Sequence, residues 1–235
     1  MMIDSDSDAV FTAHSASVRG LMRMQEQHAP PLAPARIGEA CHGDGFTPRQ
    51  MATMGLRIGS WMQLASGRKF WPLDPRPEEI HIEDIAAALS KLCRYGGHCK
   101  RFYSVAEHSV LMAHAAPDGY HLDALLHDAS EAYLADVIRP IKSSLTNYHA
   151  IEAALERAIG RRFGTRQTTP DAVKHLDNAI LADERAQNME PMPGIPDAEW
   201  GARLPALGVT LQFWSPEKAE FEFLAAFRRY GGHWC

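Results

Sequence analysis

The sequence lacks, or has little of, three features, and each absence excludes a class of protein. It has only four cysteines in 235 residues, too few and too scattered for the disulfide framework of a small secreted domain. No run approaches the roughly 18 consecutive apolar residues that a membrane-spanning helix requires. The formal net charge of −5 provides no general basic field, so we do not expect the chain to wrap duplex nucleic acid.

The N-terminal residues, MMIDSDSDAV, are acidic where a secretory signal would be basic, so we expect a cytoplasmic protein with reduced thiols. An alternative remains open for two of the thiols: Cys93 and Cys99, with His98 between them, could bind zinc. Their spacing differs from that of common zinc sites, and no second pair accompanies them. The hydrophobic content of 46% is ordinary for a globular domain with a substantial core.

No internal repeat divides the chain, and its composition changes once. Residues 1–45 are rich in proline, alanine and glycine without a sustained period, which predicts a loosely ordered N-terminal arm. Residues 46–235 are predicted to form one all-α domain, because apolar residues recur there at helical spacing. The expected helices span residues 47–67, 82–95, 104–116, 122–138, 148–164, 170–189 and 215–232, with an extended loop at 67–79 and a short strand at 209–214.

Several of these helices have recognisable end signals. Ser104, with Glu107 three residues later, forms a capping box in which each residue would satisfy a backbone donor of the first turn. Pro140 is predicted to end the helix before it, and Gly164 to end the next one. Ser215 is a favourable N-cap for the last helix.

An imidazole and a carboxylate stand side by side at His127 and Asp128, inside the apolar run LDALLHDASEAYLADVIRP. His108 lies on the preceding helix among apolar neighbours, and Asp177 lies on a later helix. First-row divalent metals take such ligands from proteins, and a buried carboxylate needs such a partner. The four residues therefore form a candidate metal site, although a surface pair or a hydrogen-bonded core histidine would explain each residue singly.

Two further carboxylates follow on the same predicted helix. Glu131 lies one turn after His127, where it would stand beside the metal and could handle the attacking water. Asp136 lies two turns after Asp128 and extends the acidic wall. Both are candidate catalytic residues.

The segments CRYGGHCKRFYSVAEHS, LLHDASEAYLADVIRPIK and VKHLD resemble the motifs of the HD-domain metal-dependent phosphohydrolases. The similarity spans about residues 60–190 and is greatest to the bacterial 5′-deoxynucleotidase branch and to small viral dATP triphosphohydrolases. It implies a single helical HD-domain bundle. The implied metal ligands are His108, His127, Asp128 and Asp177. Asp183 is the competing choice for the last ligand, and the local VKHLD pattern favours Asp177.

The resemblance also implies roles for residues around the ligands. Glu131 matches a carboxylate that positions or activates water, and Asp136 a further carboxylate of the site. Tyr95 stands where the family packs an aromatic ring, often tryptophan, against the sugar, which bears on selection for deoxyribose. The implied substrate-binding residues are Arg94, Tyr95, Lys142 and Lys174. The three cations would hold phosphate oxygens, and for each lysine a solvated surface charge is the alternative.

These observations predict a metal-dependent hydrolase of nucleoside phosphates, with Co, Mn, Zn or Mg as the divalent ion. The expected reaction is 5′-dephosphorylation of deoxynucleoside monophosphates. The alternative is a triphosphohydrolase that releases triphosphate from a deoxynucleoside triphosphate such as dATP. A di-iron oxygenase would need further histidines, and the intervening stretch supplies His149 alone. A non-catalytic nucleotide-binding module would not need Glu131 and Asp136.

The expected partner is a nucleotide, with no duplex nucleic acid and no membrane. The resemblance implies a homo-oligomer; the apolar stripe FEFLAAF at residues 221–227 is a candidate contact, though it could equally pack within the chain. Phe70 and Trp71 could stack on a nucleobase or belong to a packed connector, and the connector is favoured. Trp61 is expected in the core.

Overall fold

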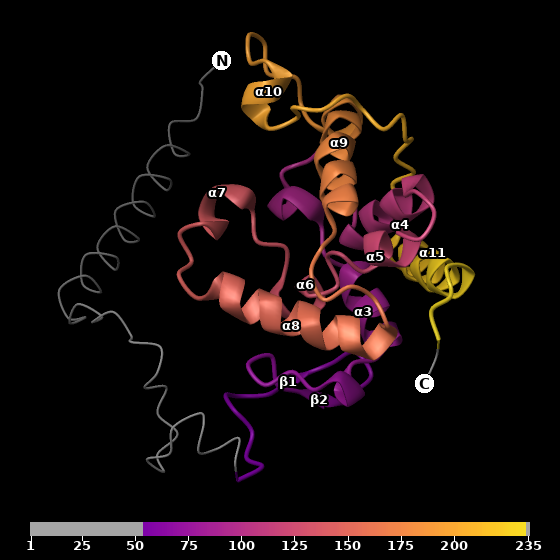
Figure 1. The fold of residues 1–235 in the computed structure, drawn as a ribbon. Coiled ribbons are helices and arrows are strands. Elements are labelled where there is room, and N and C mark those ends of the chain that lie inside the picture. Colours follow the sequence, from indigo (N-terminus) through magenta and orange to yellow (C-terminus); the bar gives the residue numbers. More distant parts are fainter. Residues whose placement is uncertain (1–53, 234–235) are drawn as a thin grey trace, which may run out of the picture. The chain divides into compact units, whose positions relative to one another are not determined.

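Helices form nearly all the regular structure of residues 54–233, the part of the chain that this computed structural model describes (Figure 1). The α-helices are α3 (Ile82–Leu89), α4 (Val105–Ala115), α5 (His121–Leu125), α6 (Glu131–Leu134), α7 (Arg139–Lys142), α8 (Tyr148–Phe163), α9 (Asp171–Asn188), α10 (Asp197–Trp200) and α11 (Pro216–Arg229). The 3-10 helices are η1 (Pro77–Glu79) and η2 (Arg94–Gly97), and the strands β1 (Met62–Gln63) and β2 (Lys69–Phe70) pair antiparallel. The predicted all-α class is confirmed for this region. No helix in it is long and apolar enough to cross a bilayer.

The main apolar core collects side chains from α3, α4, α6, α8 and α11. Phe223 and Phe227 of α11 are fully buried in it, whereas Phe221 is exposed. The stripe at residues 221–227 therefore packs largely within the chain, which was one of the two alternatives that the sequence predicted for it. Helix α9 packs against α4 through a second apolar cluster that includes Met112, Val173 and Ile180.

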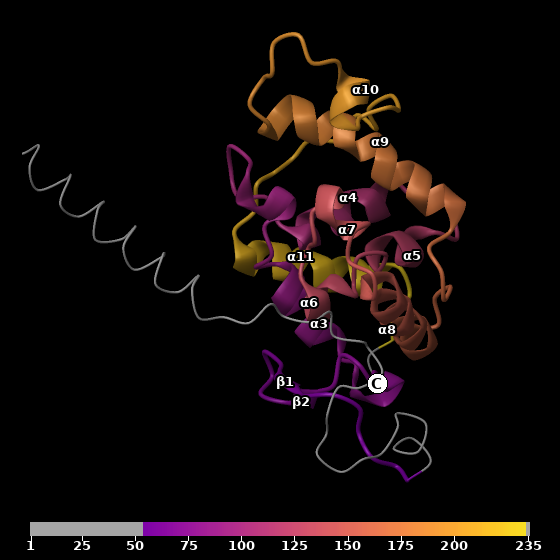
Figure 2. The same cartoon turned by 90° about the vertical axis from the view of Figure 1, so that its left-hand side faces the viewer.

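Helices α4 and α5 occupy the middle of the bundle. In both views α9 lies on one side of them and α8 on the other (Figure 1 and Figure 2). Because α9 packs against α4, residues far apart in the sequence can meet between these two helices.

Three predicted helix ends are confirmed. Helix α4 begins after Ser104, whose Oγ accepts a hydrogen bond of 3.1 Å from the Glu107 N–H. Helix α8 ends at Gly164, whose φ of 71° lies in the left-handed region that glycine adopts without steric cost. Ser215 caps α11 by accepting a hydrogen bond from the Lys218 N–H.

The second half of the predicted capping box is wrong. The Glu107 carboxylate accepts hydrogen bonds from the N–H groups of Gln212, Phe213 and Trp214, at 2.6, 2.9 and 2.7 Å. The strand predicted at residues 209–214 is wrong as well, because those three backbone donors pair with one buried carboxylate and not with a neighbouring strand. The contact fastens the segment before α11 to the first turn of α4.

The continuous helix predicted at residues 122–138 is also wrong. Helix α5 ends at Leu125, and the next eight or so residues contain tight i→i+3 hydrogen bonds and the short α6. Pro140 lies in the first turn of α7 and does not end a helix. His127 and Asp128 consequently lie in the turn between α5 and α6. A helix would direct neighbouring side chains about 100° apart, whereas this turn lets both reach one centre.

Upstream, the predicted helix at 47–67 is wrong for residues 54–67, which form turns and β1. Residues 47–53 lie outside the described region, as does the arm predicted at residues 1–45. At Met62 and Gln63, pairing with β2 therefore overrides the helical pattern of the sequence.

The aromatic side chains near this hairpin serve packing. Trp61, expected in the core, is 49% exposed, so that prediction is wrong. Phe70 is fully buried and stacks on Tyr133, with ring centroids 4.2 Å apart. Trp71 packs beneath the guanidinium of Arg57. The segment is thus the packed connector that the sequence favoured.

Candidate metal centre and its cavity

Four ligand-type side chains from three separate segments converge inside the bundle. His108 of α4, His127 of the α5–α6 turn and Asp177 of α9 offer ligand atoms that all lie within 4.8 Å of one another. Asp128 joins them, with its Oδ2 3.1 Å from the Nε2 of His127 and 3.8 Å from the Nε2 of His108. The structure therefore groups three of the residues that the sequence proposed as ligands, His108, His127 and Asp177, and places Asp128 against the two histidines.

Both imidazoles are oriented by a contact at Nδ1. His127 Nδ1 lies 2.8 Å from the carbonyl oxygen of Ala124, and His108 Nδ1 lies 2.7 Å from Glu184 Oε1. These oxygens accept, so each Nδ1 donates its proton, and each Nε2, once deprotonated, can bind a metal. Both Nε2 atoms are buried without a hydrogen-bond partner. They face carboxylates, which are also acceptors, and a metal cation between them would satisfy both groups.

The electrostatics of this cluster favour positive charge at its centre. Burial alone would lower the pKa of His127, but the charge of Asp128 raises it to about 9. Burial would raise the pKa of Asp128, yet His127 and then His108 hold it at about 2. Burial opposes ionisation of Asp177 too, but its contact with His108 keeps its pKa well below the ordinary value. A divalent ion would supply this positive charge in place of a proton.

Glu184, which the sequence reasoning missed, organises the buried side of the site. Its carboxylate is fully buried and contacts His108, the hydroxyl of Tyr95 and the Nε of Arg94 at 3.3 Å. Burial would raise its pKa, but Arg94 and His108 hold the pKa at about 2. One signal was available: Glu184 follows Asp177 by two helical turns, so both lie on the same face of α9.

Asp183, the alternative fourth ligand, serves another purpose. Its carboxylate accepts hydrogen bonds from the backbone N–H groups of Leu207 and Gly208, at 2.7 and 3.1 Å. It anchors the connector that leads to α11, whereas Asp177 faces the two histidines.

A cavity of about 420 Å³ opens beside this cluster, a volume within the range of small-molecule sites. One part of its lining is charged and the other is apolar and aromatic. The charged residues are Arg94, Asp128, Glu131, Asp136, Arg139, Lys142 and Asp177. The remaining residues are Tyr95, His98, Val137, Ile138, Pro140, Leu181, Met189 and Trp200.

The predicted catalytic carboxylates both line this cavity. Glu131 is buried with one carboxylate oxygen unpartnered, and burial together with the charges of Asp128 and Asp136 raises its pKa. Burial also raises the pKa of Asp136. Each carboxylate is therefore a better proton acceptor than an exposed one.

The predicted substrate-binding cations divide into three cases. Arg94 is buried between Glu184 and Asp128, 3.6 Å from the latter. Lys142 lines the cavity, and its ammonium lies 2.7 Å from Glu152. The structure does not bring Lys174 to the cavity: its side chain is 60% exposed and pairs with an aspartate on its own helix.

Arg139 was not predicted, although it lines the cavity. Its guanidinium donates to Asp177 Oδ2 at 3.0 Å, while its side chain remains 57% exposed. It stands at the start of α7, where the sequence showed only an arginine before a proline. The structure thus offers a second arginine beside the candidate ligands.

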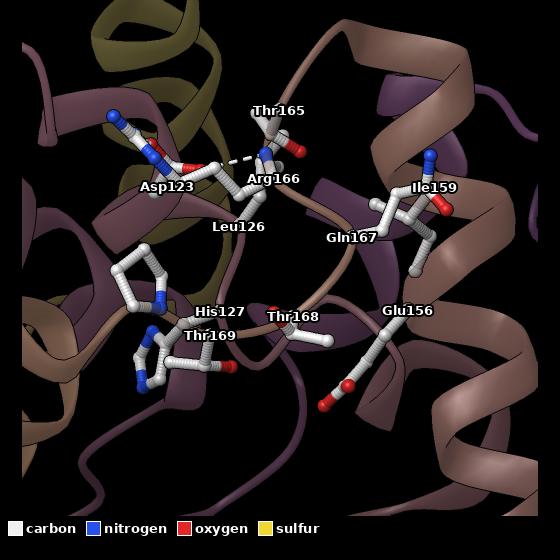
Figure 3. A pocket seen from close by; sticks show the side chains of 11 residues that line it. Asp123, Leu126, His127, Glu156, Ile159, Thr165, Arg166, Gln167, Thr168 and Thr169 are labelled. Atoms are coloured by element: carbon white, nitrogen blue, oxygen red, sulfur yellow. Dashed lines mark hydrogen bonds and ion pairs between the residues drawn. The ribbon is translucent and has the colours of Figure 1, made fainter.

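A second cavity lies next to His127 on the side of residues 165–170 (Figure 3). Its volume of about 20 Å³ accommodates roughly one water molecule. The contact between Arg166 and Asp123 closes one side of it, and Glu156 lies on the opposite side (Figure 3). Only the larger of these two cavities can hold a metabolite.

The alternative zinc site lacks a third ligand within the described residues. The Sγ atoms of Cys93 and Cys99 lie 3.7 Å apart, and both thiols are free. In the absence of a metal, burial and then Cys93 raise the pKa of Cys99 to about 11, so this thiol is protonated at neutral pH. Among residues 54–233, the side chains that lie close enough to share a metal ion in a group of three or more are those of His108, His127 and Asp177. Cys41 and Cys235 lie outside the described region.

Comparison with known proteins identified relatives without an assigned activity. No family model matches the chain. It is 37% identical over 126 residues to the uncharacterized protein YfdR of Escherichia coli, an alignment that covers 54% of this chain and 71% of the relative. It is 36% identical over 150 residues to an uncharacterized protein of Rhodobacter capsulatus, covering 60% of this chain and 76% of that protein.

Proposed function

This chain belongs to the family of the uncharacterized protein YfdR, and we propose that it is a metal-dependent phosphohydrolase that removes the 5′-phosphate from deoxynucleoside monophosphates. The observation that carries the proposal is the pair of buried Nε2 atoms, on His108 and His127, that face two carboxylates at the edge of a cavity of about 420 Å³. The resemblance of the motifs to HD-domain phosphohydrolases supports the same reaction class.

The ligand set fits a first-row divalent ion. Two neutral imidazoles and two carboxylates would hold it, with Glu184 and the Ala124 carbonyl orienting the rings. A divalent ion bound there would activate a water molecule and withdraw charge from a phosphoryl oxygen.

The residues of the cavity would perform the remaining tasks. Glu131, with its raised pKa and free carboxylate oxygen, orients the attacking water and accepts its proton. Asp136 lies within the same wall and supports that proton transfer. Arg94 and Arg139 donate N–H groups to phosphoryl oxygens, and Lys142 adds a point charge.

The charge balance of the cavity supports a monophosphate over a triphosphate. Its lining includes three cations and four carboxylates, and two of the cations, Arg94 and Lys142, are also paired with Glu184 and Glu152 outside the lining. A divalent ion would therefore leave too little positive charge to match a triphosphate. The absence of Lys174 from the lining weakens the case for a longer phosphate chain.

The other two functions have less support. A di-iron oxygenase would need His149 or another histidine at the centre, but the His149 side chain is 62% exposed and lies beside Glu152. A binding module without activity would leave the unpartnered Glu131 carboxylate without a purpose.

The test uses the full chain, stripped with EDTA and reloaded separately with Mn²⁺, Co²⁺, Mg²⁺ or Zn²⁺. Release of orthophosphate from deoxynucleoside monophosphates is the expected result, and tripolyphosphate from dATP would support the alternative. Asp128→Asn should lose both activity and the metal-dependent rise in melting temperature. Asp171→Asn, on the exposed start of α9, is the matched control and should retain both. No hydrolysis of either substrate with any of the four ions would overturn the proposal.

A further inference from the structure

The apolar part of the larger cavity has no role in the reaction described above. The proposed hydrolysis uses the carboxylates and cations of the lining and the two histidines beside it. The same cavity is also lined by Tyr95, Ile138, Leu181, Met189 and Trp200. Apolar and aromatic side chains that remain accessible beside a charged site indicate a ligand with an uncharged, flat portion.

Trp200 is held in place by the helix that also carries a candidate metal ligand. It ends α10, which has only four residues and would not be stable alone. From α9, the Arg185 guanidinium lies 3.0 Å from Asp197 Oδ1 and donates to the Ile195 carbonyl at 2.8 Å. Its central carbon also lies 5.5 Å from the Trp200 ring centroid. Arg185 thus fixes α10 to α9 and presents the indole to the cavity.

The indole does not stand alone. The rings of Trp200 and Tyr95 have centroids 5.7 Å apart and are tilted by 45°. The Tyr95 hydroxyl is engaged by Glu184, which orients His108 through the same carboxylate. One buried carboxylate, that of Glu184, therefore contacts both the aromatic pair and the candidate metal centre. The two aromatic rings are thereby held at a fixed position relative to the candidate metal ligands.

We propose that Trp200 binds the nucleobase by stacking and is the main determinant of binding for the base end of the substrate. This proposal rests on the proposed function in one respect, namely that the ligand is a nucleotide whose phosphate lies at the candidate metal centre. His98 is the one imidazole among the residues that line the cavity, and it could hydrogen-bond the edge of a base. Stacking on a flat wall tolerates every base, so purines and pyrimidines both bind.

The first test measures binding without hydrolysis. The full chain is titrated with 2′-deoxyadenosine, which has no phosphate to lose, and with 2-deoxyribose, which has no base; ligand-observed NMR reads both. The wild type should bind the nucleoside in preference to the sugar. Trp200→Ala should weaken nucleoside binding about tenfold or more, and Trp200→Phe should restore most of it. Trp61→Ala, which removes a half-exposed indole outside the cavity, is the control and should leave binding unchanged.

The second test separates this inference from the proposed function. With dAMP as substrate, Trp200→Ala should raise KM about tenfold, whereas hydrolysis of 2-deoxyribose 5-phosphate should be unchanged. If the chain hydrolyses neither ester but Trp200→Ala still weakens nucleoside binding, the proposed function fails and the base site stands. If both esters are hydrolysed and Trp200→Ala alters neither nucleoside binding nor the KM for dAMP, the base site is wrong. Failure of the folded wild type to bind 2′-deoxyadenosine at millimolar concentration would also overturn it.

Discussion

The Glu184 carboxylate lies 2.7 Å from the Nδ1 of His108 and turns the opposite nitrogen of that imidazole towards Asp177. The same carboxylate contacts Arg94 and the Tyr95 hydroxyl, both of which line the cavity. A single buried residue of α9 therefore sets the orientation of a candidate metal ligand and of two candidate substrate contacts.

We expect Glu184→Gln to weaken metal binding about tenfold or more, because the neutral amide no longer fixes the His108 tautomer or raises its basicity. Calorimetric titration with Mn²⁺ measures the affinity. Glu190→Gln, a change of the same chemistry at a side chain that is 84% exposed, is the control and should bind the ion as the wild type does. Equal affinities for both variants, with both folded, would show that Glu184 does not orient the ligand.

Arg139→Ala should raise the KM for dAMP about tenfold, because a charge-assisted contact to phosphate is lost. Metal affinity should not fall, since the variant removes a cation that lies 3.0 Å from Asp177. Steady-state kinetics and Mn²⁺ titration distinguish the two effects. Arg203→Ala, at an exposed arginine outside the cavity, should change neither quantity. A fall in metal affinity with unaltered KM would assign Arg139 to the metal site instead.

The parts of the fold that local sequence determines were predictable. Ser104, Gly164 and Ser215 act on backbone groups within four residues of themselves, and all three helix ends are where those residues indicate. The pairing of His127 with Asp128 was also visible, since chemistry at adjacent positions needs no knowledge of the fold.

The parts of the fold that depend on partners distant in the sequence were not predictable. The helix expected at residues 122–138 is interrupted at His127 and Asp128, whose side chains meet those of α4 and α9, and no local propensity encodes those contacts. The Glu107 carboxylate finds its donors more than a hundred residues downstream. Trp200 belongs to a connector without helical periodicity, and contacts of α10 with Arg185 and of the indole with Tyr95 hold it at the cavity.

Glu107→Ala should lower the free energy of unfolding by about 3 kcal/mol or more, because three backbone N–H groups lose a buried, charged acceptor. Ser104→Ala at the same helix end removes one capping bond and should cost about 1 kcal/mol. Urea denaturation measures both. Equal losses for the two variants would mean that the segment before α11 does not depend on Glu107.

His114 provides a pH-dependent contribution to stability at a distance from the metal centre. It lies on α4, and its Nδ1 is 2.7 Å from the Tyr230 hydroxyl. Burial, and then the charge of Arg229, lower the pKa of His114 below its ordinary value of about 6.5. The folded protein therefore binds this proton more weakly than the unfolded chain, so stability is fully present above about pH 6.5 and declines as the pH falls through that value. An NMR titration of the wild type should give a midpoint below pH 6.5 for the imidazole signal that is missing from His114→Gln. Between pH 7.5 and 5.5, the melting temperature of His114→Gln should fall less than that of the wild type. A midpoint at or above 6.5 would contradict the prediction.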